Sequence, residues 1–153
     1  MANITSGVYP VFNNVFKIGK AGVTSTEPGD MVTIAELETF SVSIDTNIEE
    51  WTSMTQEGWI SRLATGKGFS ISLSGKRCVG DPGNDYVSGL MFKTGTDLST
   101  KFEWTLPTGT KVAFNCVVNI SSAGGDSTNV EGLEFEVMSN GKPTVTPVES
   151  AQE

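Results

Sequence analysis

The chain has 153 residues, of which 18 are acidic, 10 are basic and none is histidine, giving a net charge of -8. This length suits one domain, residues 1–153, with room for a real hydrophobic core. The acidic excess argues against tight binding to nucleic-acid phosphates. The lack of histidine removes the commonest general base and the commonest metal ligand. We therefore expect no enzyme, and we nominate no catalytic residue, metal ligand or cofactor site.

The N-terminus lacks the charged and apolar regions of a secretory signal, and no run approaches the ~18 apolar residues of a membrane span. The two cysteines, Cys78 and Cys116, do not form a CxxC pair. Cys116 lies within an apolar segment, which predicts a buried thiol that packs like a small hydrophobic side chain. We expect a soluble protein that is made in a cytoplasm and has no membrane contact.

The first part of the chain contains few regular patterns. Residues 1–30 are rich in Gly, Asn, Thr and Pro, which predicts an extended N-terminal arm with one short strand. Residues 31–45 are strand-like, but the apolar positions change parity between Leu37 and Phe40. This change predicts a bulge or sharp twist near residues 38–39.

Two segments, 40–44 and 69–73, nearly repeat each other, and each alternates apolar residues with serines. Because successive side chains on a strand point to opposite faces, each segment has one apolar wall and one hydroxyl wall. No base accompanies the serines, so they are not interpreted as nucleophiles. The candidate residues for a lumen-facing or solvent-facing surface are Ser41, Ser43, Asp45, Ser70, Ser72 and Ser74.

Residues 45–68 separate these two strands, and we expect them to form a long loop. Loops beyond about 12–15 residues are uncommon in compact domains and are usually functional or disordered. This loop is also apolar, which favours a contact between subunits. For Trp51 and Trp59, folding back onto the chain's own core and insertion into a partner remain equally open. The candidate oligomer-interface residues are Trp51, Met54, Trp59, Ile60 and Leu63.

A dense cluster of turn formers at residues 80–85 is followed by apolar residues at helical spacing. Asp81 or Asn84 is expected to cap a short helix that runs through Phe92, with Gly95 just beyond its end. Acidic residues at positions 81, 85, 97 and 126 do not have the spacing of a calcium loop.

The last third of the chain is predicted to be β-structure. Residues 101–106 and 111–120 alternate around a Pro-Thr-Gly turn, which predicts a hairpin, and Trp104 is expected to lie in the core. Residues 133–137 predict a strand with the leucine, phenylalanine and valine inward, and residues 143–153 an extended C-terminal arm. The whole pattern of about six strands and one helix predicts a mainly β fold, a β-sandwich or small barrel with one flanking α-helix.

In their order and spacing, several short motifs resemble the major tail tube proteins of long-tailed bacteriophages, particularly the non-contractile, siphovirus type. The similarity covers roughly residues 32–147 and lies in 48–51 (IEEW), 57–59 (EGW), 65–67 (TGK), 69–76 (FSISLSGK), 80–86 (GDPGNDY), 93–95 (KTG), 101–104 (KFEW), 125–127 (GDS), 132–137 (GLEFEV) and 141–143 (GKP).

This resemblance implies a structural virion protein that assembles into stacked hexameric rings and forms a hollow phage tail tube for DNA delivery. It implies an inner sheet made from 33–45, 69–76 and parts of 101–120, with contacts between rings made by 45–68 and the first ~20 residues. The implied partners are other copies of the chain, the tail tip, tape measure and terminator proteins, and double-stranded DNA that passes without tight binding. The implied location is the phage tail of the virion, assembled in the host bacterial cytoplasm.

Two further interpretations stay open. The inner tube of a contractile tail or a tailocin differs only in the sheath around it, which the sequence does not reveal. A carbohydrate-binding β-sandwich would use Trp51 and Trp59 as sugar platforms, but the chain shows neither a secretion signal nor a clear calcium cluster. An enzyme is the weakest alternative, because no acid–base pair can be named.

Overall fold

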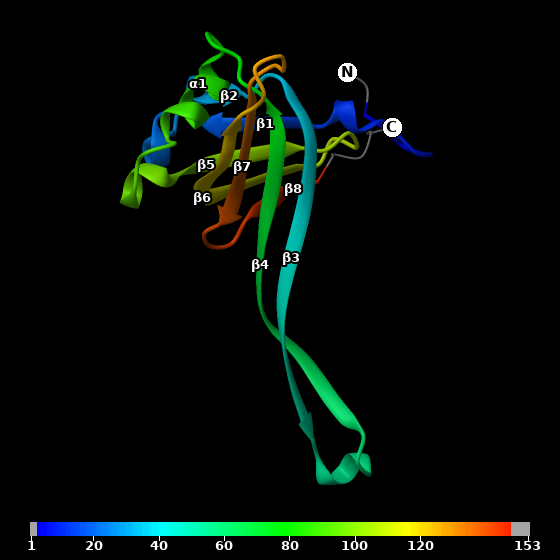
Figure 1. Ribbon diagram of the computed structural model, residues 1–153. Helices are drawn as coiled ribbons and strands as arrows, with labels where there is room; N and C mark the ends of the chain where they lie inside the picture. The colour runs from blue at the N-terminus through cyan, green and yellow to red at the C-terminus, as the bar shows by residue number, and fades with distance from the viewer. Residues whose placement is uncertain (1–2, 148–153) are drawn as a thin grey trace.

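Eight antiparallel strands form one sheet in the computed structural model, which describes residues 3–147 (Figure 1). The order is β2-β1-β5-β6-β7-β4-β3, and β8 pairs with β6 beyond the end of β7. The mainly β prediction is confirmed, with two more strands than expected. The strands are β1 (Val15–Gly19), β2 (Met31–Thr33), β3 (Leu37–Thr52), β4 (Ile60–Lys76), β5 (Ser99–Thr105), β6 (Lys111–Gly124), β7 (Gly132–Ser139) and β8 (Thr144–Thr146).

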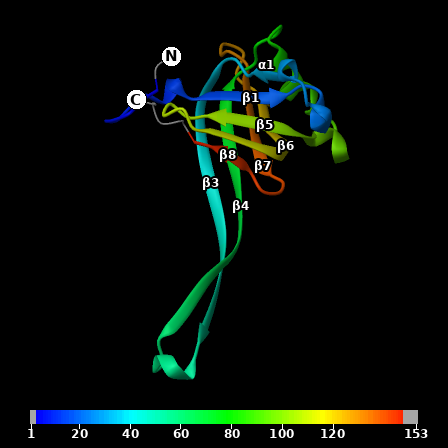
Figure 2. The same ribbon diagram turned by 180° about the vertical axis from the view of Figure 1, so that it is seen from behind.

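The sheet curls over a central core, so that strands at its two ends face each other. In Figures 1 and 2, β1, β5 and β6 cross β3, β4 and β7 at a steep angle. Phe16 of β1 packs edge-to-face on Phe40 of β3, and Phe69 of β4 packs in the same way on Phe114 of β6. β1 and β3 do not pair, so the curled sheet is not a closed barrel.

The core is made of the side chains that point inward from alternate positions of each strand. In β7, Leu133, Phe135 and Val137 are almost fully buried, while Glu134 and Glu136 lie on the opposite face, as predicted. Burying one such apolar side chain contributes roughly 1.5–3 kcal/mol. The core also contains Ile18, Ile71, Leu73, Val87, Phe102, Phe114, Cys116 and Val118, with Trp104 packed against it.

The predicted bulge near residues 38–39 is confirmed, because the β3–β4 register shifts between the pairs Leu37–Gly75 and Thr39–Ser74. A β-carbon on Gly75 would collide with the backbone carbonyl of Glu36. The strand therefore needs glycine at this point to let the bulged backbone approach.

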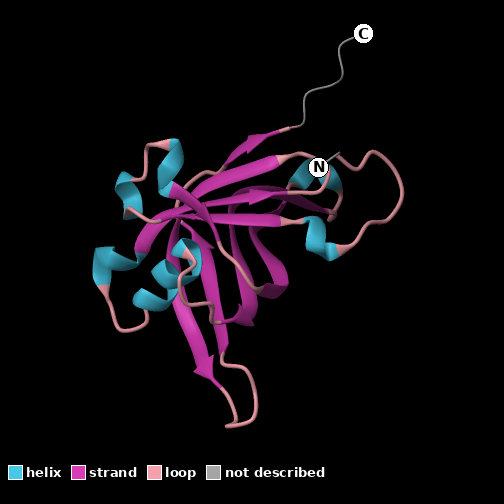
Figure 3. Ribbon diagram, turned by 90° about the horizontal axis from the view of Figure 1, so that it is seen from above, coloured by secondary structure: helices cyan, strands magenta, loops and turns pink. Residues whose placement is uncertain are grey.

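One α-helix, α1 (Pro82–Gly89), lies beside the sheet, and Figure 3 shows the helical segments at the rim of the body. Asp81 caps it by accepting a hydrogen bond from the backbone N–H of Asn84, with Pro82 in the first turn, as predicted. The expected extension through Phe92 is wrong: the helix ends at Gly89, whose low helix propensity favours termination. The 3₁₀ turns are η1 (Val11–Asn13), η2 (Gly22–Thr24), η3 (Pro28–Asp30), η4 (Met54–Gln56) and η5 (Gly95–Leu98).

The N-terminal segment contains one short strand, as predicted, and the C-terminal segment contains one that was not predicted. The N-terminal segment includes β1, which supplies Phe16 and Ile18 to the core, and residues 1–2 lie outside the described part of the chain. Near the other end, β8 pairs with the start of β6, whereas residues 148–153 of the predicted C-terminal arm also lie outside the described part. Between residues 3 and 147, no helix has the length and apolar content needed to cross a bilayer.

Candidate assembly surface

The predicted loop 45–68 is instead a long β-hairpin, so that expectation is wrong. Strands β3 and β4 continue past the body and pair with each other, with one bulge, as far as Thr52 and Ile60 (Figures 1 and 2). We call residues 44–68 the arm. Pairing satisfies the backbone groups that an irregular loop of this length would leave to water. The tip contains η4 and a tight turn, where Glu57 and Gly58 have φ values of 51° and 91°.

A bulge interrupts the pairing in the middle of the arm. The register changes between the pairs Asn47–Gly66 and Ile48–Ala64, which leaves Thr65 without a partner. The side-chain amide of Asn47 donates a 2.8 Å hydrogen bond to Thr65 Oγ1, which holds the bulge in place. Because side chains alternate along a strand, this extra residue reverses the faces taken by the β4 residues nearer the tip.

The predicted interface residues are all solvent-exposed on this arm. Trp51 and Trp59 have exposed fractions of 49% and 77%, so neither folds back onto the chain's own core. Two further exposed residues of the arm, Ile44 and Ile48, were missed by sequence reasoning. The sequence did contain a signal for them, because both residues occupy even positions, like the apolar residues Phe40 and Val42 earlier in β3. The exposed apolar residues of the arm are Ile44, Ile48, Trp51, Met54, Trp59, Ile60 and Leu63.

The arm carries six charged residues, two of which form an ion pair. Arg62 Nε lies 2.7 Å from a carboxylate oxygen of Glu50 on the opposite strand, and both side chains are more than half exposed. Exposed pairs of this kind contribute about 0–1 kcal/mol. The salt bridge therefore does little to hold the arm together.

The predicted hydroxyl wall exists on the outer face of the body. Ser41 of β3 pairs with Ser72 of β4, which in turn pairs with Glu136 of β7, so the three side chains lie side by side on one face. Asp45 continues this face into the arm, opposite Gly68. The serine-side surface comprises Ser41, Ser43, Asp45, Ser70, Ser72, Ser74, Glu134 and Glu136, together with the exposed Met138 opposite Ser70.

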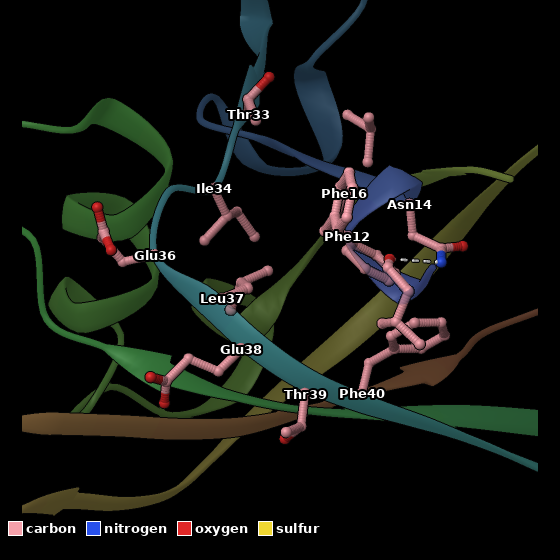
Figure 4. Close-up of a pocket in the computed structure, with 12 residues that line it drawn as sticks. Phe12, Asn14, Phe16, Thr33, Ile34, Glu36, Leu37, Glu38, Thr39 and Phe40 are labelled. Carbon is pink, nitrogen blue, oxygen red and sulfur yellow. Dashed lines mark hydrogen bonds between the residues drawn. The ribbon is translucent and has the colours of Figure 1, made fainter. Parts of the chain in front are cut away.

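A second apolar feature lies at the seam where β1 and β3 meet without pairing. A cavity of about 280 Å³ opens there, and its lining includes Phe16, Ile34, Leu37 and Phe40 (Figure 4). Phe12 stands beside it with an exposed fraction of 83%. Sequence reasoning missed this cavity, because it arises where segments far apart in the chain approach each other.

The described residues do not assemble a recognisable catalytic centre. Across residues 3–147, no three His, Cys, Asp or Glu residues lie together as a metal site. Burial raises the pKa of the Cys116 thiol from 9.0 to about 12, which keeps it protonated. In this part of the chain, every fully buried side-chain nitrogen and oxygen also has a hydrogen-bond partner. What the fold does bring together is apolar and hydroxyl surface.

Comparison with solved structures identifies chains of similar fold. No protein-family model matches the chain, and no curated protein sequence matches it. A chain in the C6-symmetric tail of an empty gene transfer agent particle is similar in structure, with a TM-score of 0.70 and 21% identity over 91% of this chain and 99% of that one. A chain in the virion of a native gene transfer agent has a TM-score of 0.67 and 18% identity over the same shares. At these identities the likeness establishes a shared fold.

Proposed function

We propose that this chain is a tail tube protein, a structural subunit that assembles into stacked hexameric rings of a long, non-contractile phage-like tail. The observation that carries the proposal is the likeness of fold, over 91% of the chain, to a chain of a C6-symmetric tail. Under this proposal the chain has a structural role and no enzymatic one.

The two ends of the strand order support closure into a ring. Within residues 3–147, β2 and β3 each pair with one neighbour and leave the other edge free. Free strand edges promote association unless they are covered. In the proposed ring, head-to-tail contacts between subunits cover these edges, and the same kind of contact repeated along an axis produces a tube.

The arm supports stacking of such rings. It carries large apolar side chains into solvent, and Trp51, Trp59 and Leu63 are all about half exposed or more. Contiguous exposed apolar surface marks interaction sites on soluble proteins. We assign the arm to contacts between neighbouring rings, together with the N-terminal segment that contains Phe12.

The serine-side surface is proposed to line the lumen. Hydroxyl groups and the carboxylates of Asp45, Glu134 and Glu136 would face the DNA there. Negative charge repels phosphate, so the genome would pass without tight binding. A lumen that gripped the DNA would instead require a basic surface.

The remaining partners follow from the same role. A tube needs proteins that start, measure and stop it, so we propose tail tip, tape measure and terminator proteins as partners. Assembly would take place in the cytoplasm of a bacterial host, and the finished protein would reside in the virion tail. The inner tube of a contractile tail or tailocin is distinguished by a sheath, which would be visible in micrographs of the source particles.

The test is negative-stain electron microscopy of the purified chain over a range of protein and salt concentrations. Hollow filaments or six-fold rings are expected, and higher salt should favour them because it screens the repulsion between subunits of net charge -8. Compact monomers at every concentration, combined with binding to a glycan array, would contradict the proposal and favour the carbohydrate-binding alternative.

A further inference from the structure

We infer that the arm is a two-sided insert whose opposite faces are covered by two different neighbouring copies of this chain. The inference rests on the proposed function and extends it by naming what covers each face. The register of β3 and β4 divides the apolar residues of the arm between two faces.

The two faces of the arm continue the two faces of the body. The core-side face follows Val42 and Ile71 outward and carries Ile44, Ile48 and, nearer the tip, Ile60. The serine-side face follows Ser43 and Ser70 outward through Asp45 and Asn47, and nearer the tip it carries Trp51 and Leu63. Apolar side chains are therefore exposed on both faces of the same ribbon.

The bulge at Thr65 determines this distribution. If Thr65 instead paired with Ile48 in regular register, strict alternation from Phe69 would put Leu63 on the core-side face, opposite Glu50. With the bulge, Leu63 lies opposite Glu49 and joins Trp51 on the serine-side face. Side chains on neighbouring diagonal positions of two strands are within reach of each other when they are large. The bulge thus gathers Trp51 and Leu63 into one apolar cluster.

The chain's own body does not cover either face. The arm projects away from the body in both views (Figures 1 and 2), and beyond Phe69 its strands pair only with each other. An isolated two-stranded hairpin is at best marginally stable in water and needs packing on its faces. Because the two faces point in opposite directions, one flat partner surface would cover only one of them.

Further copies of the chain suit both faces. The proposed ring places two adjacent subunits next to any point on its edge, so a projecting ribbon can enter between them. Each copy also offers apolar surface of its own, at the seam cavity of about 280 Å³ and at the exposed Phe12. The contact must be apolar because every copy carries the same net charge of -8, which opposes association through charge alone.

Paired substitutions on each face test the inference. Ile48→Thr with Ile60→Thr removes apolar groups from the core-side face, and Trp51→Thr with Leu63→Thr removes them from the serine-side face. Threonine retains a high strand propensity, so pairing within the arm is preserved. Each pair should raise the protein concentration needed for filament assembly about 30-fold or more, as expected for interface hot spots.

The matched control is Val79→Thr with Phe92→Thr, which replaces two exposed apolar residues of the body outside the arm. It should leave the assembly concentration within about twofold of wild type. If only one of the two apolar pairs affects assembly, the arm is covered on one side and the inference is overturned.

Photo-cross-linking separates this inference from the proposed function. A benzophenone amino acid is placed in the full chain at position 48 or at position 63, and the cross-linked peptides are identified by mass spectrometry. The inference predicts different peptides from the two positions. The same peptide from both, or cross-links from only one, would overturn it. If wild-type protein forms no filaments and binds glycans instead, the proposed function fails, and cross-links in concentrated solution still decide whether copies contact both faces.

Discussion

Phe16 and Phe40 pack edge-to-face with ring centroids 4.9 Å apart, although their strands do not pair and stand near opposite ends of the sheet order. This contact joins the two ends of the curled sheet across the core. The indole ring of Trp104 packs against both rings and extends the cluster. Aromatic contacts of this kind add about 0.5–1.5 kcal/mol beyond the apolar area that they bury.

Phe16→Ala should therefore destabilise the body strongly. The side chain has an exposed fraction of 6%, and removing a buried phenylalanine typically costs about 3–5 kcal/mol through lost burial and a residual cavity. Urea unfolding of the monomer measures this change. Phe92→Ala is the control, because Phe92 is 92% exposed and its removal should change the free energy of unfolding by no more than about 0.5 kcal/mol.

Asp81→Ala should lower stability by about 1–2 kcal/mol, as expected for loss of a helix cap. The carboxylate oxygen Oδ2 accepts hydrogen bonds from the backbone N–H groups of Asn84 and Ala35, each at 3.0 Å. It therefore caps α1 and also anchors the connection between β2 and β3. Asp81→Asn keeps an acceptor at this position and should recover most of the loss in the same urea measurement. Equal stability of Asp81→Ala and wild type would contradict this role.

The free energy of unfolding should fall as the pH rises above about 9. Burial raises the pKa of Cys116 to about 12, and a backbone hydrogen bond with Thr100 lowers it only in part. The folded state keeps the thiol proton that the unfolded state releases near its ordinary pKa of 9.0. Stability from this group is complete below pH 9 and is lost between pH 9 and about 12, by up to ~1.4 kcal/mol per pH unit.

The check is a comparison of wild type with Cys116→Val by urea unfolding at several pH values from 8 to about 11. Subtracting the two profiles removes the contributions of other groups that titrate in this range. The variant should lose less stability with rising pH than wild type does. Parallel profiles would contradict the assignment to Cys116.

Trp59→Ala should weaken filament assembly without destabilising the monomer. The side chain is 77% exposed at the tip of the arm, so its removal leaves the core intact. As an interface hot spot it should contribute ~2 kcal/mol or more per contact. Sedimentation of filaments measures assembly, and Thr55→Ala, at the same tip, is the matched control. Unchanged filament formation by Trp59→Ala would exclude this residue from the contact.

Much of the body could be predicted from the sequence, because its strands have one buried and one exposed face. Residues 133–137 alternate cleanly, and β7 follows that alternation. The cap at Asp81 was also correct, since turn formers precede an apolar run at helical spacing. The end of α1 was not, because apolar residues at helical spacing continue past Gly89 and outweighed the low helix propensity of that glycine.

The arm could not be predicted as a hairpin for a physical reason. Period-2 alternation appears when one face of a strand is apolar and the other is polar. Here both faces carry apolar side chains, and the bulge at Thr65 shifts the parity of β4. The apolar residues of this segment therefore do not recur at every second position. The exposed tryptophans still drew attention to the segment as a surface for contacts. The seam cavity depends on strands distant in sequence, which local patterns do not report.

The pairing of β3 with β4 along the arm also sets the length of the arm. A strand advances about 3.3 Å per residue, so the distance from the body to the tip is fixed by the number of paired residues between Asp45–Gly68 and Thr52–Ile60. Adding two residues to each strand would move the tip by about 7 Å and keep every side chain on its face. Adding one would exchange the faces. Under the proposed function, the spacing between neighbouring rings therefore changes in steps of two residues without any change to the core.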